Sequence, residues 1–213
     1  MMLSFIYERK YHILIFLVIL FLLVVNNNYR NLKQLKEANE VLAYNLFSEY
    51  LFTYDKMLSG LSNIIEPNET AKNNEYWFHA QCNRFFTYGS IIEENHYYHR
   101  RINYQPILEI QLYKISYQAM DLSLYISSGE INIDDTTVSE LKMIKANLSN
   151  LYKELSAYKV DLPFTGYTDQ EEKNAAKSTL KNLKKDQDKL NKKINDILGQ
   201  NEVLINKILS NQS

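Results

Sequence analysis

The feature that most constrains the fold of this chain is an apolar segment close to its first residue. Residues 13–25 are all apolar, and residues 11–29 contain no Asp, Glu, Lys or Arg. A helix that crosses the hydrocarbon core of a bilayer, roughly 30 Å thick, needs about 20 such residues. Tyr11 and Tyr29 flank this stretch, where aromatic side chains anchor helices in the membrane interface. The sequence therefore predicts a transmembrane signal anchor at 11–29, after a short cytoplasmic N-terminus at 1–10.

Two other interpretations of the apolar segment remain open. One is a cleaved signal peptide, whose apolar core has about this length but is followed by small residues. Here Val24 and Val25 are followed by three asparagines, so we favour an uncleaved anchor. The other is a buried helix of a soluble protein.

The orientation of this anchor depends on the basic residues that flank it. Arg9 and Lys10 precede the segment, whereas Arg30, Lys33 and Lys36 follow it. The positive-inside rule counts basic residues, so the two flanks are nearly equal. A short basic N-terminus is typical of a signal anchor whose N-terminus is cytoplasmic. We therefore expect the bulk of the chain to lie outside the cytoplasm, which its single cysteine is compatible with.

Composition excludes several classes of protein. The 24 basic and 25 acidic residues give a net charge of −1, which argues against a nucleic-acid partner. One cysteine excludes an intrachain disulfide and a CxxC zinc site. Five glycines and three prolines are too few for a turn-rich β-sandwich or a glycine-rich phosphate loop. Because no GxSxG or HExxH motif is present either, we predict no enzyme, no catalytic residue and no cofactor.

Apolar residues spaced three and four apart predict helix through most of the remaining chain. A stalk helix is expected at 30–66, and Pro67 ends it. An aromatic-rich helical region is expected at 67–130 and a helical hairpin at 131–213. No competing strand pattern is present.

The hairpin has sequence signals for both of its helices. Thr137 with Glu140, and Thr168 with Glu171, match the S/T-x-x-E capping box that begins a helix. The short linker at 161–168 is expected to turn the second helix back against the first. The second helix is expected to run unbroken for about 40 residues, which is longer than its partner. Part of it therefore has to pack on the stalk or on another chain.

The last helix carries apolar residues at alternating spacings of four and three, the period of a coiled coil. Two amides, Gln187 and Asn201, also fall on this seam. A buried amide at such a position costs stability but fixes the register. The predicted seam consists of Leu180, Leu183, Leu190, Ile194, Ile197, Asn201, Leu204 and Ile208.

Aromatic residues crowd the region 76–104, and two interpretations are open: they fill the core of the bundle, or they form a recognition surface. Neighbouring arginines suit the second interpretation, because a guanidinium binds carboxylate or phosphate with two hydrogen bonds. The candidate partner or ligand surface is Trp77, Arg84, Phe85, Tyr97 and Arg100. The aromatic series continues downstream at Tyr113, Tyr117 and Tyr125.

Three histidines and the cysteine are the candidate metal ligands. His79 and Cys82 are three residues apart, as are His96 and His99, which places each pair on one helix face. On one continuous helix the two pairs lie about 25 Å apart. Only a reversal of the chain at Gly89 brings them together. We therefore predict no metal.

These observations predict an all-α protein in which a single-pass transmembrane helix precedes an elongated helical bundle with a C-terminal antiparallel coiled-coil-like hairpin. The expected function is that of a membrane-anchored extracytoplasmic binding or scaffold protein. It acts by helix packing against a protein partner or a second copy of itself. The alternative is a sensory or ligand-binding bundle that signals through a separate partner.

Overall fold

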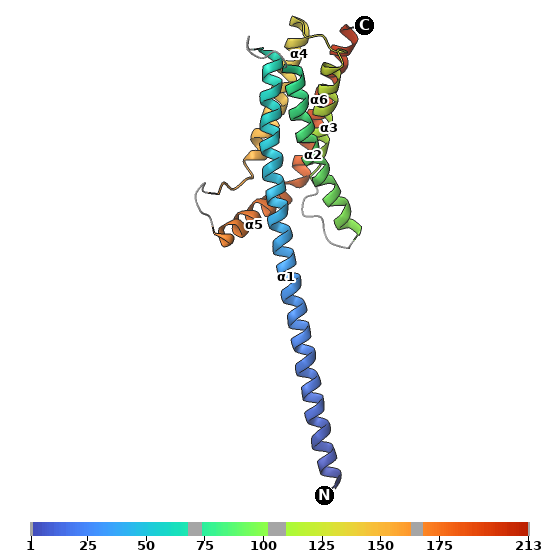
Figure 1. The fold of residues 1–213 in the computed structure, drawn as a ribbon, viewed down its shortest axis with the longest axis vertical. Coiled ribbons are helices and arrows are strands. Elements are labelled where there is room, and N and C mark those ends of the chain that lie inside the picture. The colour runs from blue at the N-terminus through green and yellow to red at the C-terminus, as the bar shows by residue number, and fades with distance from the viewer. Residues whose placement is uncertain (1, 68–73, 102–109, 163–167, 213) are drawn as a thin grey trace. The chain divides into compact units, whose positions relative to one another are not determined.

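The computed structural model describes residues 2–67, 74–101, 110–162 and 168–212; for 2–17 and 95–101 it describes the backbone only. The predicted all-α class is confirmed: these described residues form helices and no strand (Figure 1). The six helices are α1 Met2–Ile65, α2 Asn74–Arg101, α3 Leu112–Ser127, α4 Asp135–Ser156, α5 Asp169–Lys185 and α6 Gln187–Asn211.

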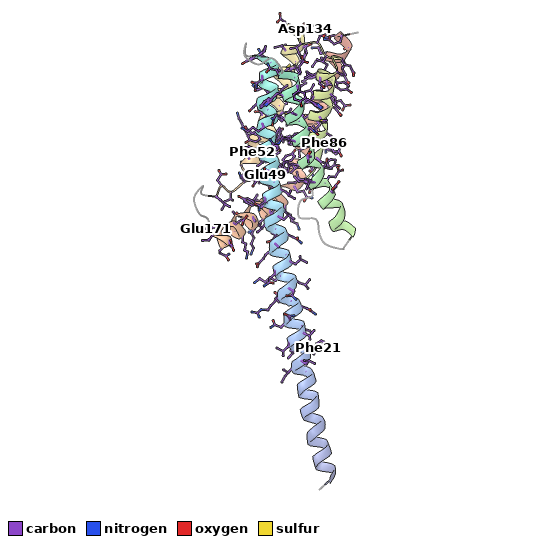
Figure 2. The ribbon with its side chains drawn as sticks, in the orientation of Figure 1. Phe21, Glu49, Phe52, Phe86, Asp134 and Glu171 are labelled. Carbon is purple, nitrogen blue, oxygen red and sulfur yellow. The ribbon has the colours of Figure 1, made fainter. Side chains whose placement is uncertain are left out.

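The chain divides into two compact units, residues 1–39 and 40–213. The first unit is the N-terminal part of α1. Its apolar side chains from Val18 to Val25 are each 46–67 % exposed, and Figure 2 shows Phe21 pointing away from the helix. Within the described part of the chain, no helix is both long and apolar enough to cross a membrane. Of the predicted anchor, the side chains of residues 11–17 lie outside the described residues.

The second unit is a helical bundle in which α1, α2 and α3 follow one another in alternating directions. Near the end of α1, the Asn74 side chain donates a hydrogen bond to the Asn63 carbonyl across 3.0 Å. Further back along α1, the rings of Tyr50 and Phe85 lie 4.7 Å apart. From the first contact to the second, the residue number falls on α1 and rises on α2, so these two helices are antiparallel. Antiparallel neighbouring helices are typical of helical bundles.

Helices α4 and α6 form an antiparallel pair. Glu140 pairs with Lys207 at 2.5 Å, and Asn147 donates to Asn201 at 2.9 Å. From the first pair to the second, the residue number rises on α4 and falls on α6, so the two helices are antiparallel. Helix α6 also packs against α3, and these two helices are parallel. It therefore has two neighbours.

Tyrosines of α1 fill the centre of the second unit. Tyr50 and Tyr54 are fully buried, and burial raises the pKa of both phenols well above its usual value. A buried hydroxyl needs a partner. The Tyr50 hydroxyl donates to the Leu112 carbonyl of α3 across 2.7 Å, and Tyr54 donates to the Leu148 carbonyl of α4 across 2.9 Å. These two bonds tie α1 to both neighbours.

The capping box expected at Thr137 and Glu140 is wrong. α4 begins earlier, and the Asp134 side chain is the N-cap, accepting a hydrogen bond from the Thr137 N–H across 2.7 Å. This carboxylate accepts the Thr137 N–H, which Glu140 would accept in the predicted capping box, and the same bond lowers the pKa of Asp134. Glu140 is buried instead and faces Lys207 of α6.

The capping box at Thr168 and Glu171 is confirmed. The Thr168 N–H donates to the Glu171 carboxylate across 2.7 Å, and the Glu171 N–H donates back to the Thr168 hydroxyl across 3.3 Å. α5 therefore starts where the sequence predicts it. It packs on the second unit's part of α1, where Ala175 and Ala176 lie against Tyr44.

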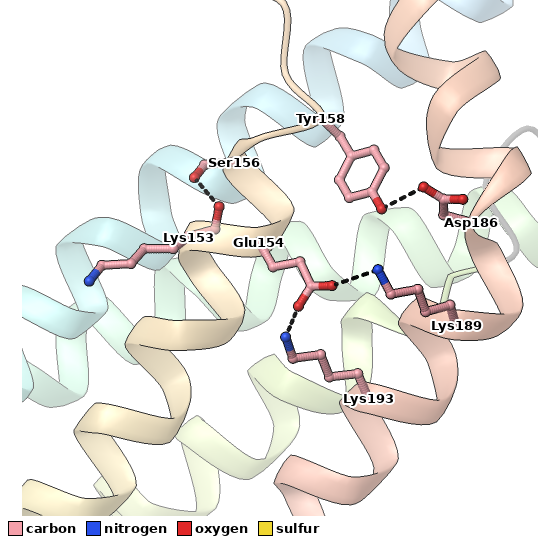
Figure 3. A network of polar contacts seen from close by, with 7 residues as sticks. All are labelled: Lys153, Glu154, Ser156, Tyr158, Asp186, Lys189 and Lys193. Carbon is pink, nitrogen blue, oxygen red and sulfur yellow. Dashed lines mark hydrogen bonds and ion pairs between the residues drawn. The ribbon is translucent and has the colours of Figure 1, made fainter.

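The prediction of an unbroken final helix is wrong, because Asp186 separates α5 from α6. Its backbone has φ −105° and ψ 13°, outside the helical range. Its side chain accepts a hydrogen bond from the Tyr158 hydroxyl across 2.9 Å (Figure 3). Next to this contact, Glu154 of α4 pairs with both Lys189 and Lys193 of α6. The break lets α5 pack on α1 while α6 packs on α3 and α4.

The predicted seam residues other than Leu204 are buried, but they are divided between α5 and α6. Leu204 is only half-buried, and Ile205 beside it is 6 % exposed. A seam made only of a and d positions is wide enough to cover one neighbouring helix. Because α6 has two neighbouring helices, it needs a wider apolar face. The buried seam members are Leu180, Leu183, Leu190, Ile194, Ile197, Asn201 and Ile208.

Candidate functional site

The candidate site is an open groove of about 430 Å³ between α3 and α6. The inward face of α3 is apolar and buried, with Leu112, Ile115 and Leu122 at or below 2 % exposure. Its outer face presents a residue to the groove at every fourth position, which keeps them on one side of a helix. The lining residues are Tyr113, Lys114, Tyr117, Gln118, Asp121 and Tyr125 of α3, with Leu198, Glu202, Ile205 and Asn206 of α6.

Contacts with α2 hold Tyr117 in place. The Phe86 ring lies edge-on to it, with centroids 4.8 Å apart, and the Tyr113 ring lies edge-on at 5.9 Å. The Tyr117 hydroxyl donates to the Glu93 carboxylate across 3.2 Å. Partial desolvation and then the Glu93 charge raise the pKa of Tyr117, so the phenol stays neutral at physiological pH.

The charged groups of the groove are two carboxylates, Asp121 and Glu202, and one ammonium, Lys114. The Lys114 ammonium donates to the Asn195 side chain across 3.2 Å. Tyrosine rings beside carboxylates form the surroundings that organic cations prefer, because the ring face and the carboxylate both attract positive charge. The groove is therefore suited chemically to an organic ammonium group.

Three side-chain amides centred on Asn201 join three helices beside the groove. Asn201 is fully buried. It accepts a hydrogen bond from Asn147 of α4 across 2.9 Å and donates one to Gln118 of α3 across 3.1 Å. Gln118 in turn donates to the Leu198 carbonyl across 2.8 Å. Since a shift along any helix breaks these bonds, the amides hold the walls of the groove in register.

The structure separates the residues of the surface predicted on α2. Phe85 is fully buried between the rings of Tyr50 and Tyr54, at centroid distances of 4.7 and 4.8 Å. Trp77 is 40 % exposed and Arg84 is exposed, both on α2. The side chains of Tyr97 and Arg100 lie outside the described residues. The described members therefore divide between the core and the surface.

The candidate metal ligands are also divided. α2 continues through Gly89 without a reversal of the chain. The glycine allows α3 to approach closely, because a Cβ at this position would clash with Ser116. His79 Nδ1 lies 3.1 Å from the Ser123 hydroxyl. Cys82 is fully buried, and burial raises the pKa of its thiol to about 12. The described residues contain no group of three or more His, Cys, Asp or Glu side chains that could hold a metal ion.

The side chains of His96 and His99 lie outside the described residues. The groove itself was missed by sequence reasoning, although its tyrosines belong to the aromatic series downstream of α2. The signal that could have found it is the spacing of Tyr113, Tyr117 and Tyr125, four and then eight residues apart along the outer face of α3. Which helix faces that stripe is not readable from local sequence.

Comparison with known proteins finds no relative: no family model, no curated protein and no solved structure matches the chain. Function therefore has to be argued from the residues and their geometry. Two observations bear on it, the exposed apolar run of α1 and the groove between α3 and α6.

Proposed function

We propose that the chain is a membrane-tethered helical binding protein whose anchor is the segment 11–29. The observation that carries this proposal is the run from Val18 to Val25, eight large apolar residues that are each about half exposed. A helix of a water-soluble bundle exposes a polar face and buries an apolar stripe, whereas this run is apolar on every side. Such a helix has a lower free energy in lipid than in water, because lipid removes its apolar side chains from water and its backbone hydrogen bonds are made within the helix.

We further propose that the bundle of residues 40–213 lies outside the cytoplasm and binds protein partners there. Arg9 and Lys10, which precede the segment, are the basis for this orientation. Buried helix faces and tied tyrosine hydroxyls make the bundle a rigid support for binding surfaces. Its surface also carries exposed apolar side chains, such as Leu124 at 46 % and Val203 at 68 %.

Flotation of the full chain with phosphatidylcholine–phosphatidylglycerol vesicles tests the membrane proposal. We expect the chain to rise with the vesicles in a density gradient, and the double variant Leu20→Arg, Leu23→Arg to remain at the bottom. Each arginine at the centre of a spanning helix costs about 2.5–3.5 kcal/mol. The matched control is Leu124→Arg, Val203→Arg, which puts the same charges on the bundle and should float. A wild-type chain that stays at the bottom, or an unaffected Leu20, Leu23 variant, contradicts the proposal.

A second function, ligand binding by the bundle, is favoured by the groove between α3 and α6. Its tyrosines and the carboxylates of Asp121 and Glu202 suit a small organic cation. In this alternative a bound ligand would act through a separate partner protein.

Thermal unfolding with added tetramethylammonium chloride tests this second function. At ten times the dissociation constant, binding stabilises the fold by about 1.4 kcal/mol. For a chain of this size that raises the melting temperature by roughly 3–5 °C over a potassium chloride control. The variant Tyr117→Leu should lose the shift, and Trp77→Leu, an exposed ring on α2 that does not line the groove, should keep it. Equal melting in the two salts, or a shift that survives Tyr117→Leu, rules the groove out for this ligand class.

A further inference from the structure

The predicted C-terminal seam is already occupied by the chain's own helices. Leu183, Leu190 and Ile194 are fully buried within the second unit. A second copy therefore has no access to them. Another stripe, in the first unit, is exposed: Leu32 is 58 % and Leu35 is 52 % exposed.

This stripe has the spacing of a coiled coil. Val25, Asn28, Leu32, Leu35 and Asn39 follow one another at intervals of three, four, three and four residues on the helix α1. Between residues 26 and 39 the remaining positions are polar apart from a tyrosine and an alanine. The two leucines therefore form a narrow apolar stripe on a polar helix, which is the pattern of a two-stranded seam.

The polar members of the stripe point to a second copy of the same helix. With Leu32 and Leu35 at the a and d positions of the heptad, Asn39 occupies the next a position. Asparagine at a single a position is the device that fixes register and favours two parallel strands. In such a pair Lys36 lies opposite Asn31 of the other copy, so no like charges meet beside the seam.

We propose that residues 30–39, which directly follow the anchor segment, pair with the same segment of a second copy as a parallel, in-register coiled coil. The proposal rests on the proposed membrane anchor, because two anchored copies have the same orientation. Anchoring also concentrates the copies in one plane, so a short seam suffices for pairing. The two copies then present two bundles together.

Disulfide formation in proteoliposomes of the full chain tests this pairing. Single variants Leu35→Cys and Asn39→Cys place a thiol on the seam, and Gln34→Cys places one on an exposed position away from it. Disulfide formation demands close and well-oriented Cβ atoms, so we expect the seam thiols to cross-link about ten times as fast as the control. Cys82 does not interfere, because it is fully buried and the raised pKa of its thiol keeps it unreactive.

Each outcome decides the proposal. Fast cross-linking at both 35 and 39 supports a parallel pair, whereas a disulfide that needs Asn28→Cys together with Asn39→Cys shows an antiparallel one and overturns it. Equal rates at 34 and 35, or monomers only, also overturn it. Flotation of the same samples separates the two proposals: chains that float without cross-linking leave the anchor intact, and chains that cross-link without floating refute only the anchor.

Discussion

We expect Leu190→Asp to remove most of the stability of the bundle formed by residues 40–213. Leu190 is fully buried near the start of α6, facing the apolar core. The variant loses the burial of the leucine and places a carboxylate in the apolar core. We expect this to lower the free energy of unfolding by about 4 kcal/mol or more. Since domains unfold at about 5–15 kcal/mol, the loss is a large part of the total.

Thermal unfolding followed by circular dichroism measures this effect. The control is Val203→Asp on the same helix, where the side chain is 68 % exposed and the substitution should change the free energy of unfolding by less than about 0.5 kcal/mol. If Leu190→Asp melts together with Val203→Asp, the seam does not lie in the core and the packing of α6 has to be redrawn.

Phe85→Ala is expected to destabilise the bundle by about 3–5 kcal/mol, because the variant leaves a cavity between two rings that cannot collapse. Phe85 is fully buried and stacks on Tyr54 with centroids 4.8 Å apart. Both tyrosines also hold α1 to α3 and α4 through their hydroxyls. Loss of the ring therefore loosens contacts among four helices.

Urea unfolding gives the free energy for this variant, with Trp77→Ala as its partner. Trp77 also belongs to the predicted surface on α2 but is 40 % exposed, so we expect its loss to cost about 1 kcal/mol or less. The pair separates the core interpretation of the aromatic residues from the recognition surface. Equal effects at the two positions would mean that Phe85 is not held as the structure describes.

Local patterns were enough to predict the helical class and two of the helix ends. The end of α1 before Pro67 and the cap at Thr168 each depend on a few neighbouring residues. The burial of seam residues such as Ile194 follows from the helical period alone. These features need no knowledge of the packing partner.

The errors fall where distant residues meet. Asp186 reads as one more polar residue of a long helix until Tyr158, 28 residues away, donates to its carboxylate. Glu140 matches a capping box until Lys207 faces it from α6. In each case a local pattern is overruled by a contact that helix periodicity does not encode.

The candidate site divides in the same way. The tyrosine stripe along α3 is visible in the sequence, yet the groove exists only because α6 lies beside α3 and the buried Asn201 bonds to Gln118 across them. Conversely, Phe85 and Trp77 look alike as aromatic residues of α2, and only packing assigns one to the core and one to the surface.

By itself, the sequence determined that the chain is helical, which faces of its helices are apolar, and where the uncharged apolar run lies. Those properties follow from short-range spacing and from the chemistry of single side chains. The tertiary structure alone decided which face meets which neighbour, where the last helix breaks, and that α3 and α6 enclose a groove. These depend on residues that are far apart in the chain and become neighbours only when burial of the apolar faces brings the helices together.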